Sequence, residues 1–205
     1  MHVTGPEAAV FYAHEKLLTS SSLVLVRSCR ELGSASSNRR IFFENLDPRS
    51  FNLYLNWLYT SAITLSSADS TGEQRYEDHW PLLINLYVLS IRLEDLDFAD
   101  AVTDAMVSYF AHTKRSDWGL QLPISNWKHF LYDNTPPKAK VRRLLVQMYA
   151  HVRDPVLLDE RDPAEFLAET SQAMMKGAAE DPLMSAATCC FHEHGNSRSC
   201  YRDRL

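Results

Sequence analysis

The stretch IFFENLDPRSFNLYLNWLYTSAI, residues 41–63, decides the predicted fold. Its apolar start at 41–43 suits a buried strand, after which Asp47 can cap a helix and Pro48 fits the first helical position. Apolar residues then recur at i, i+3, i+4, i+7 and i+8, which is the spacing of one buried helix face. The members of this face are Phe51, Tyr54, Leu55, Leu58 and Tyr59.

The segments before this stretch predict a short strand and one or two helices. Residues 9–13 alternate in polarity, as a short strand does, and a helical pattern starts at Leu17 and Leu18. A serine hydroxyl at 20–22 can cap a second helix that begins at Leu23. The four consecutive apolar residues at 23–26 also suit a strand, so both interpretations stay open.

The segments after it are helical. Pro81 opens a helix at 82–91 that is apolar on nearly every side, which is typical of a central helix. Helical spacing returns at 98–110, 123–131, 141–152 and 164–174, and it disappears from Gly177 onward. This order predicts an α+β fold, in which a cluster of helices is flanked by a small sheet of short strands and followed by a helical extension.

Composition excludes several classes of function. The 205 residues carry a net charge of −5, which argues against nucleic acid and anionic membranes as partners. The six glycines are too far apart for a phosphate-binding loop, and no apolar run approaches the roughly 20 residues that cross a bilayer. The N-terminus has no secretory pattern, so we expect an intracellular protein of the cytoplasm or nucleus.

Several segments together resemble the BTB/POZ family. Residues 11–18 followed by Ser22 resemble its strand-to-helix corner, and residues 41–51 resemble its last core strand and the next helix. Residues 56–63 resemble its W-L-Y-T-G-x-I helix end, with Ser61 in place of glycine, and residues 86–97 resemble its following pair of helices. The resemblance names these residues as a structural signature: Phe11, His14, Phe51, Trp57, Leu58, Tyr59, Leu86 and Tyr87.

The rest of the chain is similar to stand-alone BTB proteins of filamentous fungi. The similar residues are 131–136, 141–146, 166–167 and 190–194, and relative to this family the first strand is shortened to its last residues at 1–4. The predicted units are a BTB-like domain at 1–117, a helical extension at 118–177 and a flexible tail at 178–205. The resemblance implies a non-enzymatic adaptor that binds proteins and homodimerises. An alternative is a substrate receptor that recruits a cullin-type ubiquitin ligase scaffold.

Individual side chains receive structural interpretations. The resemblance implies that His14 at the corner is a structural histidine whose ring bonds neighbouring backbone. A catalytic base would need a nucleophile nearby, and no nucleophile pattern accompanies it. Aromatic residues at helical spacing, Trp57, Tyr59, Trp80 and Tyr87, are expected in the core. The basic cluster Lys138, Lys140, Arg142 and Arg143 is expected to be the solvated face of an amphipathic helix.

The tail concentrates metal-binding side chains. Thiols and imidazoles occur together within twelve residues, and zinc favours four such ligands in a tetrahedron. The predicted ligands are Cys190, His192, His194 and Cys200, with Cys189 as a substitute for His194. No standard zinc-finger spacing is present, so a zinc-binding function based on this tail and a flexible tail without cofactor are the two hypotheses.

Overall fold

The computed structural model describes residues 2–4, 10–32, 40–43, 47–65, 79–115, 120–176, 189–195 and 199–204. These residues are mostly helical and include one small sheet, in agreement with the predicted α+β class. The polar stretch at 66–79, which its composition predicts to be a surface loop, lies outside the described residues except for His79.

Three short strands form the sheet in the order β2-β1-β3, namely β1 (His2–Thr4), β2 (Val10–Tyr12) and β3 (Arg40–Phe42). β1 is the central strand, antiparallel to β2 and parallel to β3. Side chains alternate between the two faces of a sheet, so Phe11 and Ile41 pack toward the hydrophobic core. The opposite face exposes three apolar side chains, Val10, Tyr12 and Phe42.

The first helices begin at the caps that the sequence predicts. They are α1 (Glu15–Leu18), α2 (Leu23–Glu31) and α3 (Pro48–Thr60). Ser22 Oγ accepts a hydrogen bond from the backbone N–H of Leu25 at 3.1 Å, which resolves the choice between helix and strand in favour of helix. The Asp47 carboxylate accepts from the first amides of α3, and Pro48 occupies its first position.

The predicted apolar face of α3 is correct in its first turns and wrong at its end. Phe51 and Tyr54 are fully buried, whereas Leu58 is half-buried and Tyr59 is 49% exposed. The Tyr59 hydroxyl lies 2.7 Å from Nδ1 of His14, so the two side chains form an exposed pair at the strand-to-helix corner. His14 therefore bonds a side chain across the corner, where we had expected a backbone partner, and Tyr59 is not a core residue.

The centre of the molecule consists of α4 (Trp80–Arg92) and α5 (Leu96–Arg115). Leu86 and Tyr87 of α4 are completely buried, which agrees with the prediction of a central helix. Asp95 caps α5, because its Oδ1 accepts from the backbone N–H of Phe98 at 3.0 Å.

The helical extension consists of α6 (Ser125–Asp133), α7 (Lys140–Val152), the 3-10 turn η1 (Pro155–Leu157) and α8 (Ala164–Lys176). A buried ion pair joins Lys128 of α6 to Asp162, with Nζ and Oδ2 2.5 Å apart. The Lys128 ammonium also lies over the rings of Tyr149 and Phe166, at 4.7 and 4.9 Å from their centroids. The chain ends in a second 3-10 turn, η2 (Tyr201–Arg204).

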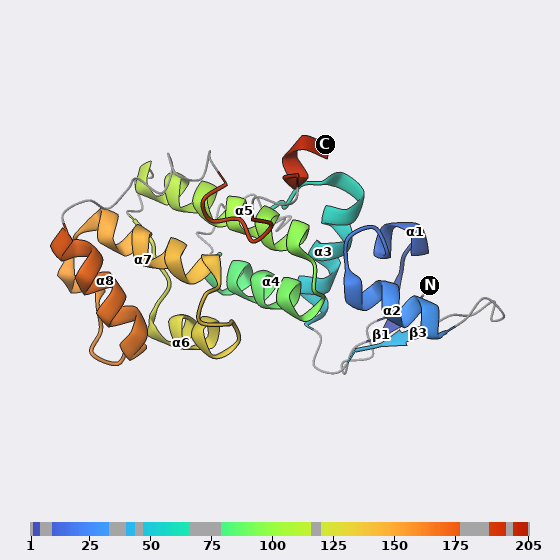
Figure 1. The fold of residues 1–205 in the computed structure, drawn as a ribbon, viewed down its shortest axis with the longest axis horizontal. Helices are drawn as coiled ribbons and strands as arrows, with labels where there is room; N and C mark the ends of the chain where they lie inside the picture. The colour runs from blue at the N-terminus through green and yellow to red at the C-terminus, as the bar shows by residue number, and fades with distance from the viewer. Residues whose placement is uncertain are drawn as a thin grey trace, which may run out of the picture.

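One hydrophobic cluster extends through these elements, from Ala13 near β2 to Phe191 near the C-terminus. Figure 1 shows α4 and α5 in the middle, with α1 to α3 and the sheet at one end and α6 to α8 at the other. The sequence divides the BTB-like part from the extension at residue 117, yet buried side chains of both belong to this cluster. Among the helices of the described residues, none combines the length and apolarity that a membrane span requires.

Candidate metal centre

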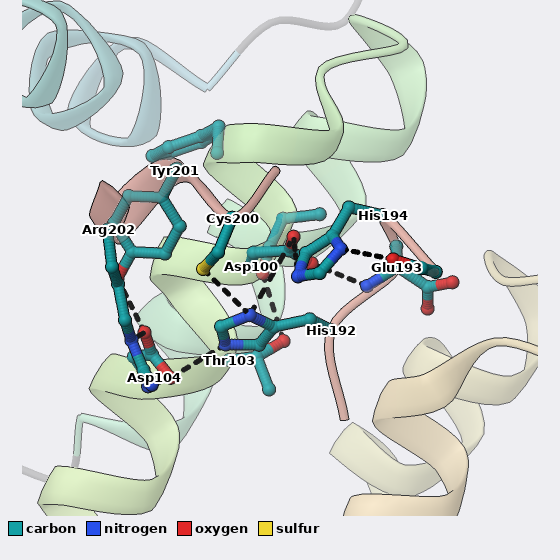
Figure 2. Close-up of polar contacts among 12 residues, drawn as sticks. Asp100, Thr103, Asp104, His192, Glu193, His194, Cys200, Tyr201 and Arg202 are labelled. Atoms are coloured by element: carbon teal, nitrogen blue, oxygen red, sulfur yellow. Dashed lines mark hydrogen bonds and ion pairs between the residues drawn. The ribbon is translucent and has the colours of Figure 1, made fainter. Parts of the chain in front are cut away.

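The C-terminal residues 189–195 and 199–204 pack against α5. Figure 1 shows this segment, in red, beside α5, and Figure 2 shows its side chains directed at two acidic residues of that helix, Asp100 and Asp104. Phe191 and His192 are almost completely buried, and Cys200 is buried as well. Where the sequence predicted a flexible tail, these residues form a packed layer, because Phe191 enters the hydrophobic cluster and the polar side chains find partners on α5.

Four side chains bring their ligand atoms together. The sulfurs of Cys189 and Cys200 and one ring nitrogen each of His192 and His194 all lie within 4.8 Å of one another. Of the four residues that the sequence predicts as ligands, the structure brings His192, His194 and Cys200 together. The fourth member is Cys189, whereas Cys190 packs against the hydrophobic cluster.

A tight turn explains why Cys189 and not Cys190 joins the group. The backbone N–H of His192 donates to the carbonyl of Cys189 at 3.0 Å, and Cys189 has a left-handed φ of 58°. Such a turn brings the first and fourth residues close together, so Cys189 and His192 share one side. Cys190 lies inside the turn, where its side chain points elsewhere.

The ring of His192 is held in an orientation that suits metal binding. Its Nε2 lies 2.9 Å from Oδ1 of Asp104, and its Nδ1 lies 3.6 Å from the sulfur of Cys200. A carboxylate only accepts hydrogen bonds, so Nε2 carries the proton and the lone pair of Nδ1 faces the thiol group. Metal-binding histidines in proteins commonly have such a carboxylate on the outer nitrogen.

The ring of His194 is oriented in the same sense. Its Nδ1 lies 2.5 Å from the carbonyl oxygen of Gly195, which fixes the proton on Nδ1. Its Nε2 is buried without a hydrogen-bond partner and lies 3.9 Å from Oδ2 of Asp100. In both imidazoles, the ring nitrogen that does not face Asp104 or the Gly195 carbonyl is therefore the one grouped with the two cysteine sulfurs.

Asp104 is the main anchor of the segment. Its carboxylate accepts hydrogen bonds from His192, from the Tyr201 hydroxyl at 2.5 Å and from the Arg202 guanidinium, with Nε at 2.8 Å. Burial alone would raise the pKa of Asp104, but these hydrogen bonds outweigh it and hold the pKa below its usual value. The carboxylate is therefore ionised and keeps the His192 ring in place.

Asp100 lies deeper, between the two imidazoles. Its Oδ1 accepts from the backbone N–H of Glu193 at 2.5 Å, while its Oδ2 is buried without a hydrogen-bond partner, 3.9 Å from Nδ1 of His192. Burial raises the pKa of Asp100 to about 6, and the hydrogen bond from Glu193 and the two histidines oppose the rise. A buried acceptor without a donor is costly, and a cation beside it would remove that cost.

The state of the cysteines is compatible with metal binding. All four cysteines of the chain are reduced. Burial, together with the neighbouring Cys200 sulfur, raises the pKa of the Cys189 thiol to about 11. A divalent cation bound to both sulfurs as thiolates would relieve the repulsion between them.

Glu193 fastens the segment to two other helices. Its Oε1 accepts from the Tyr87 hydroxyl of α4 and from the backbone N–H of Lys140, the first residue of α7, both at 2.6 Å. Burial and the adjacent Glu193 carboxylate raise the pKa of Tyr87, which therefore stays a donor. The metal-ligand segment thus connects α4, α5 and α7.

The donor set fits zinc. Zinc–sulfur bonds of about 2.3 Å and zinc–nitrogen bonds of about 2.0–2.1 Å give a sulfur–nitrogen edge of about 3.6 Å in a tetrahedron. The Cys200 sulfur and Nδ1 of His192 are 3.6 Å apart. Two thiolates also neutralise the charge of the ion. If zinc were bound, Cys189, His192, His194 and Cys200 would supply four protein ligands and leave no position for water or substrate, as in structural zinc sites.

Sequence reasoning missed the acidic partners of this site. Asp100 and Asp104 lie four residues apart on α5, a spacing that places both on one helix face next to the apolar residues. That spacing was the signal in the sequence for a shared polar site, but the residues that these two aspartates contact are about 90 residues away in the chain.

Comparison with protein-family models finds no matching family, and comparison with curated proteins finds no match either.

Proposed function

We propose that this protein is a protein-interaction module of BTB/POZ type whose C-terminal segment is fastened by a structural zinc ion. The observation that carries the zinc proposal is the orientation of His192 and His194. One nitrogen of each ring lies within hydrogen-bond distance of Asp104 or of the Gly195 carbonyl, so the other nitrogen of each ring is the one grouped with the sulfurs of Cys189 and Cys200. The module itself is proposed from the resemblance, whose segments fold in sequence as β2, α1, α2, β3, α3, α4 and α5.

The role of the ion follows from what the segment connects. Glu193, between the two histidines, bonds α4 and α7, while Asp100 and Asp104 belong to α5. Zinc at this position ties the chain end to three helices, two of which form the centre of the molecule. Its contribution is therefore to folding free energy, since a preformed site of this kind does not exist in the unfolded chain.

Elemental analysis of the purified full chain tests this function. We expect one zinc ion per chain after dialysis against metal-free buffer, and a lower melting temperature when a strong chelator is added. Protein purified in the presence of zinc that contains no stoichiometric metal, or whose melting temperature is the same with and without chelator, would contradict the proposal.

Homodimerisation through the outer face of the sheet is a second candidate function. Three apolar side chains are exposed there: Val10 at 46%, and Tyr12 and Phe42 at 71% each. Clustered exposed apolar side chains mark interaction sites. We expect light scattering to give the mass of a dimer and a Tyr12→Ser/Phe42→Ser variant to give that of a monomer. Val156, which is 87% exposed on η1, provides the control Val156→Ser, which should leave the dimer intact. A monomeric wild-type chain would contradict homodimerisation.

A further inference from the structure

A groove with basic side chains lies between α7 and α8. Its volume is about 490 Å³, and five of the side chains that line it are cationic. Four of them are Lys138, Lys140, Arg143 and Lys176. Glu169 is the acidic side chain in its lining. The groove therefore carries a local positive charge on a chain whose net charge is −5.

Arg142, the fifth cation at the groove, serves a structural purpose. It is buried, and its guanidinium bonds Glu165 at 2.8 Å and the Thr135 hydroxyl at 3.0 Å while lying 4.4 Å from the centroid of the Tyr132 ring. This corrects the expectation that the whole basic cluster is a solvated helix face. The four remaining cations determine the charge that the groove presents to a ligand.

We propose that this groove binds an acidic segment of a partner protein. Carboxylates spaced along a peptide match cations spread over the two helices. Gln147, another lining residue, has a buried Oε1 without a hydrogen-bond partner. An amide oxygen accepts from N–H or O–H groups; a peptide backbone provides N–H donors, whereas a fully ionised phosphate provides no donor.

Two observations disfavour other anions. The N-terminal amide of α7, on Lys140, already bonds the Glu193 carboxylate, so this helix end is not open to phosphate. The described side chains that line the groove include no aromatic ring, which nucleic-acid bases need for stacking. Binding of an acidic peptide requires neither an open helix N-terminus nor an aromatic ring.

The inference rests on the proposed function, an interaction module fastened by zinc, and names the chemistry of the module's partner. It also connects the groove to the metal segment, because the Arg143 guanidinium lies 5.7 Å from the ring centroid of Phe191, next to His192. Together with the hydrogen bond from the backbone N–H of Lys140 to Glu193, this contact fixes α7, which forms one wall of the groove.

Fluorescence anisotropy with a labelled hexaglutamate peptide and the full chain tests the inference. We expect saturable binding that weakens about tenfold in Lys138→Glu/Arg143→Glu. The matched control Lys16→Glu/Arg30→Glu makes the same charge change on α1 and α2, at the other end of the molecule, and should alter affinity by less than about twofold. Glu169→Gln removes the repelling carboxylate and should tighten binding, a gain that a damaged fold cannot produce.

Three results would overturn the inference: no binding of hexaglutamate, an equal loss in both double variants, or tighter binding of tripolyphosphate or an oligonucleotide than of the peptide. Zinc analysis of the same samples separates this proposal from the function on which it rests. If zinc-loaded protein does not bind hexaglutamate, the result contradicts only the proposal that the groove binds an acidic peptide. Zinc-free protein that binds it with the predicted charge dependence supports the groove and contradicts the structural zinc.

Discussion

Nε2 of His192 lies 2.9 Å from Oδ1 of Asp104, although 88 residues separate them in the chain. This contact determines which imidazole nitrogen faces the cysteine sulfurs. It also connects the C-terminal segment to the central helix α5, so the chemistry of the candidate metal centre and the packing of the chain end depend on the same carboxylate.

Asp104→Asn is predicted to weaken zinc binding by about 10- to 100-fold, because the amide no longer holds His192 in the correct tautomer with a negative charge. Competition with a chromogenic chelator measures this affinity. Asp203→Asn is the matched control, since Asp203 is an exposed acid of the same segment, and it should bind zinc as the wild type does. Equal affinities in Asp104→Asn and the wild type would show that this carboxylate does not position a ligand.

The buried pair of Lys128 and Asp162 predicts a strong effect on stability. Asp162→Asn leaves the Lys128 ammonium buried without its counter-ion and should cost about 3–5 kcal/mol of unfolding free energy. Lys128→Met/Asp162→Leu removes both charges and should recover most of that loss. Urea denaturation measures both values, and a double variant as unstable as the single one would exclude an uncompensated charge as the cause.

The Asp95 carboxyl predicts a pH dependence. Burial raises its pKa above the ordinary value of 3.8, and hydrogen bonds from Ser21, Phe98 and Tyr54 oppose the rise. Its contribution to the unfolding free energy is thus fully present below pH 3.8 and is lost as the pH rises through the raised pKa. Relative to Asp95→Asn, the wild type should gain stability as the pH falls from about 7 to about 4. Thermal melts of both proteins measure this difference, and a constant difference would refute it.

Leu58 of α3 and Leu86 of α4 should respond unequally to truncation. Leu86 is completely buried, so Leu86→Ala should cost about 2–5 kcal/mol. Leu58 is half-buried, so Leu58→Ala should cost less than about 2 kcal/mol. Chemical denaturation of the two variants compares them directly. If Leu58→Ala were the more damaging change, the core would be placed incorrectly.

Features that depend only on residues close together in the chain could be predicted from the sequence. Asp47 and Pro48 begin α3, and Ser22 caps α2, because a cap requires only a side chain and the amides two or three residues later. Periodicity also identified α4 as central. Tyr59 escaped prediction, because its exposure depends on a partner, His14, that comes from another element.

The sequence could predict that cysteines and histidines form the candidate metal centre, but it could predict only in part which of them do. The composition of the tail names thiols and imidazoles as ligands. The left-handed turn at Cys189, which selects this residue over Cys190, lies next to two residues held by distant parts of the chain, Phe191 in the hydrophobic cluster and His192 at Asp104. Asp100 and Asp104 become partners only when the chain end folds back onto α5.

The central claim is that Cys189, and not the adjacent Cys190, is a zinc ligand. The most direct test is to purify Cys189→Ser and Cys190→Ser in parallel and to measure the zinc content of each. The two variants change the same atom in neighbouring residues, so general effects on folding and oxidation are closely matched. Our account predicts that Cys190→Ser retains one zinc ion per chain and that Cys189→Ser loses it. Full zinc content in Cys189→Ser, or loss in Cys190→Ser alone, would contradict the site.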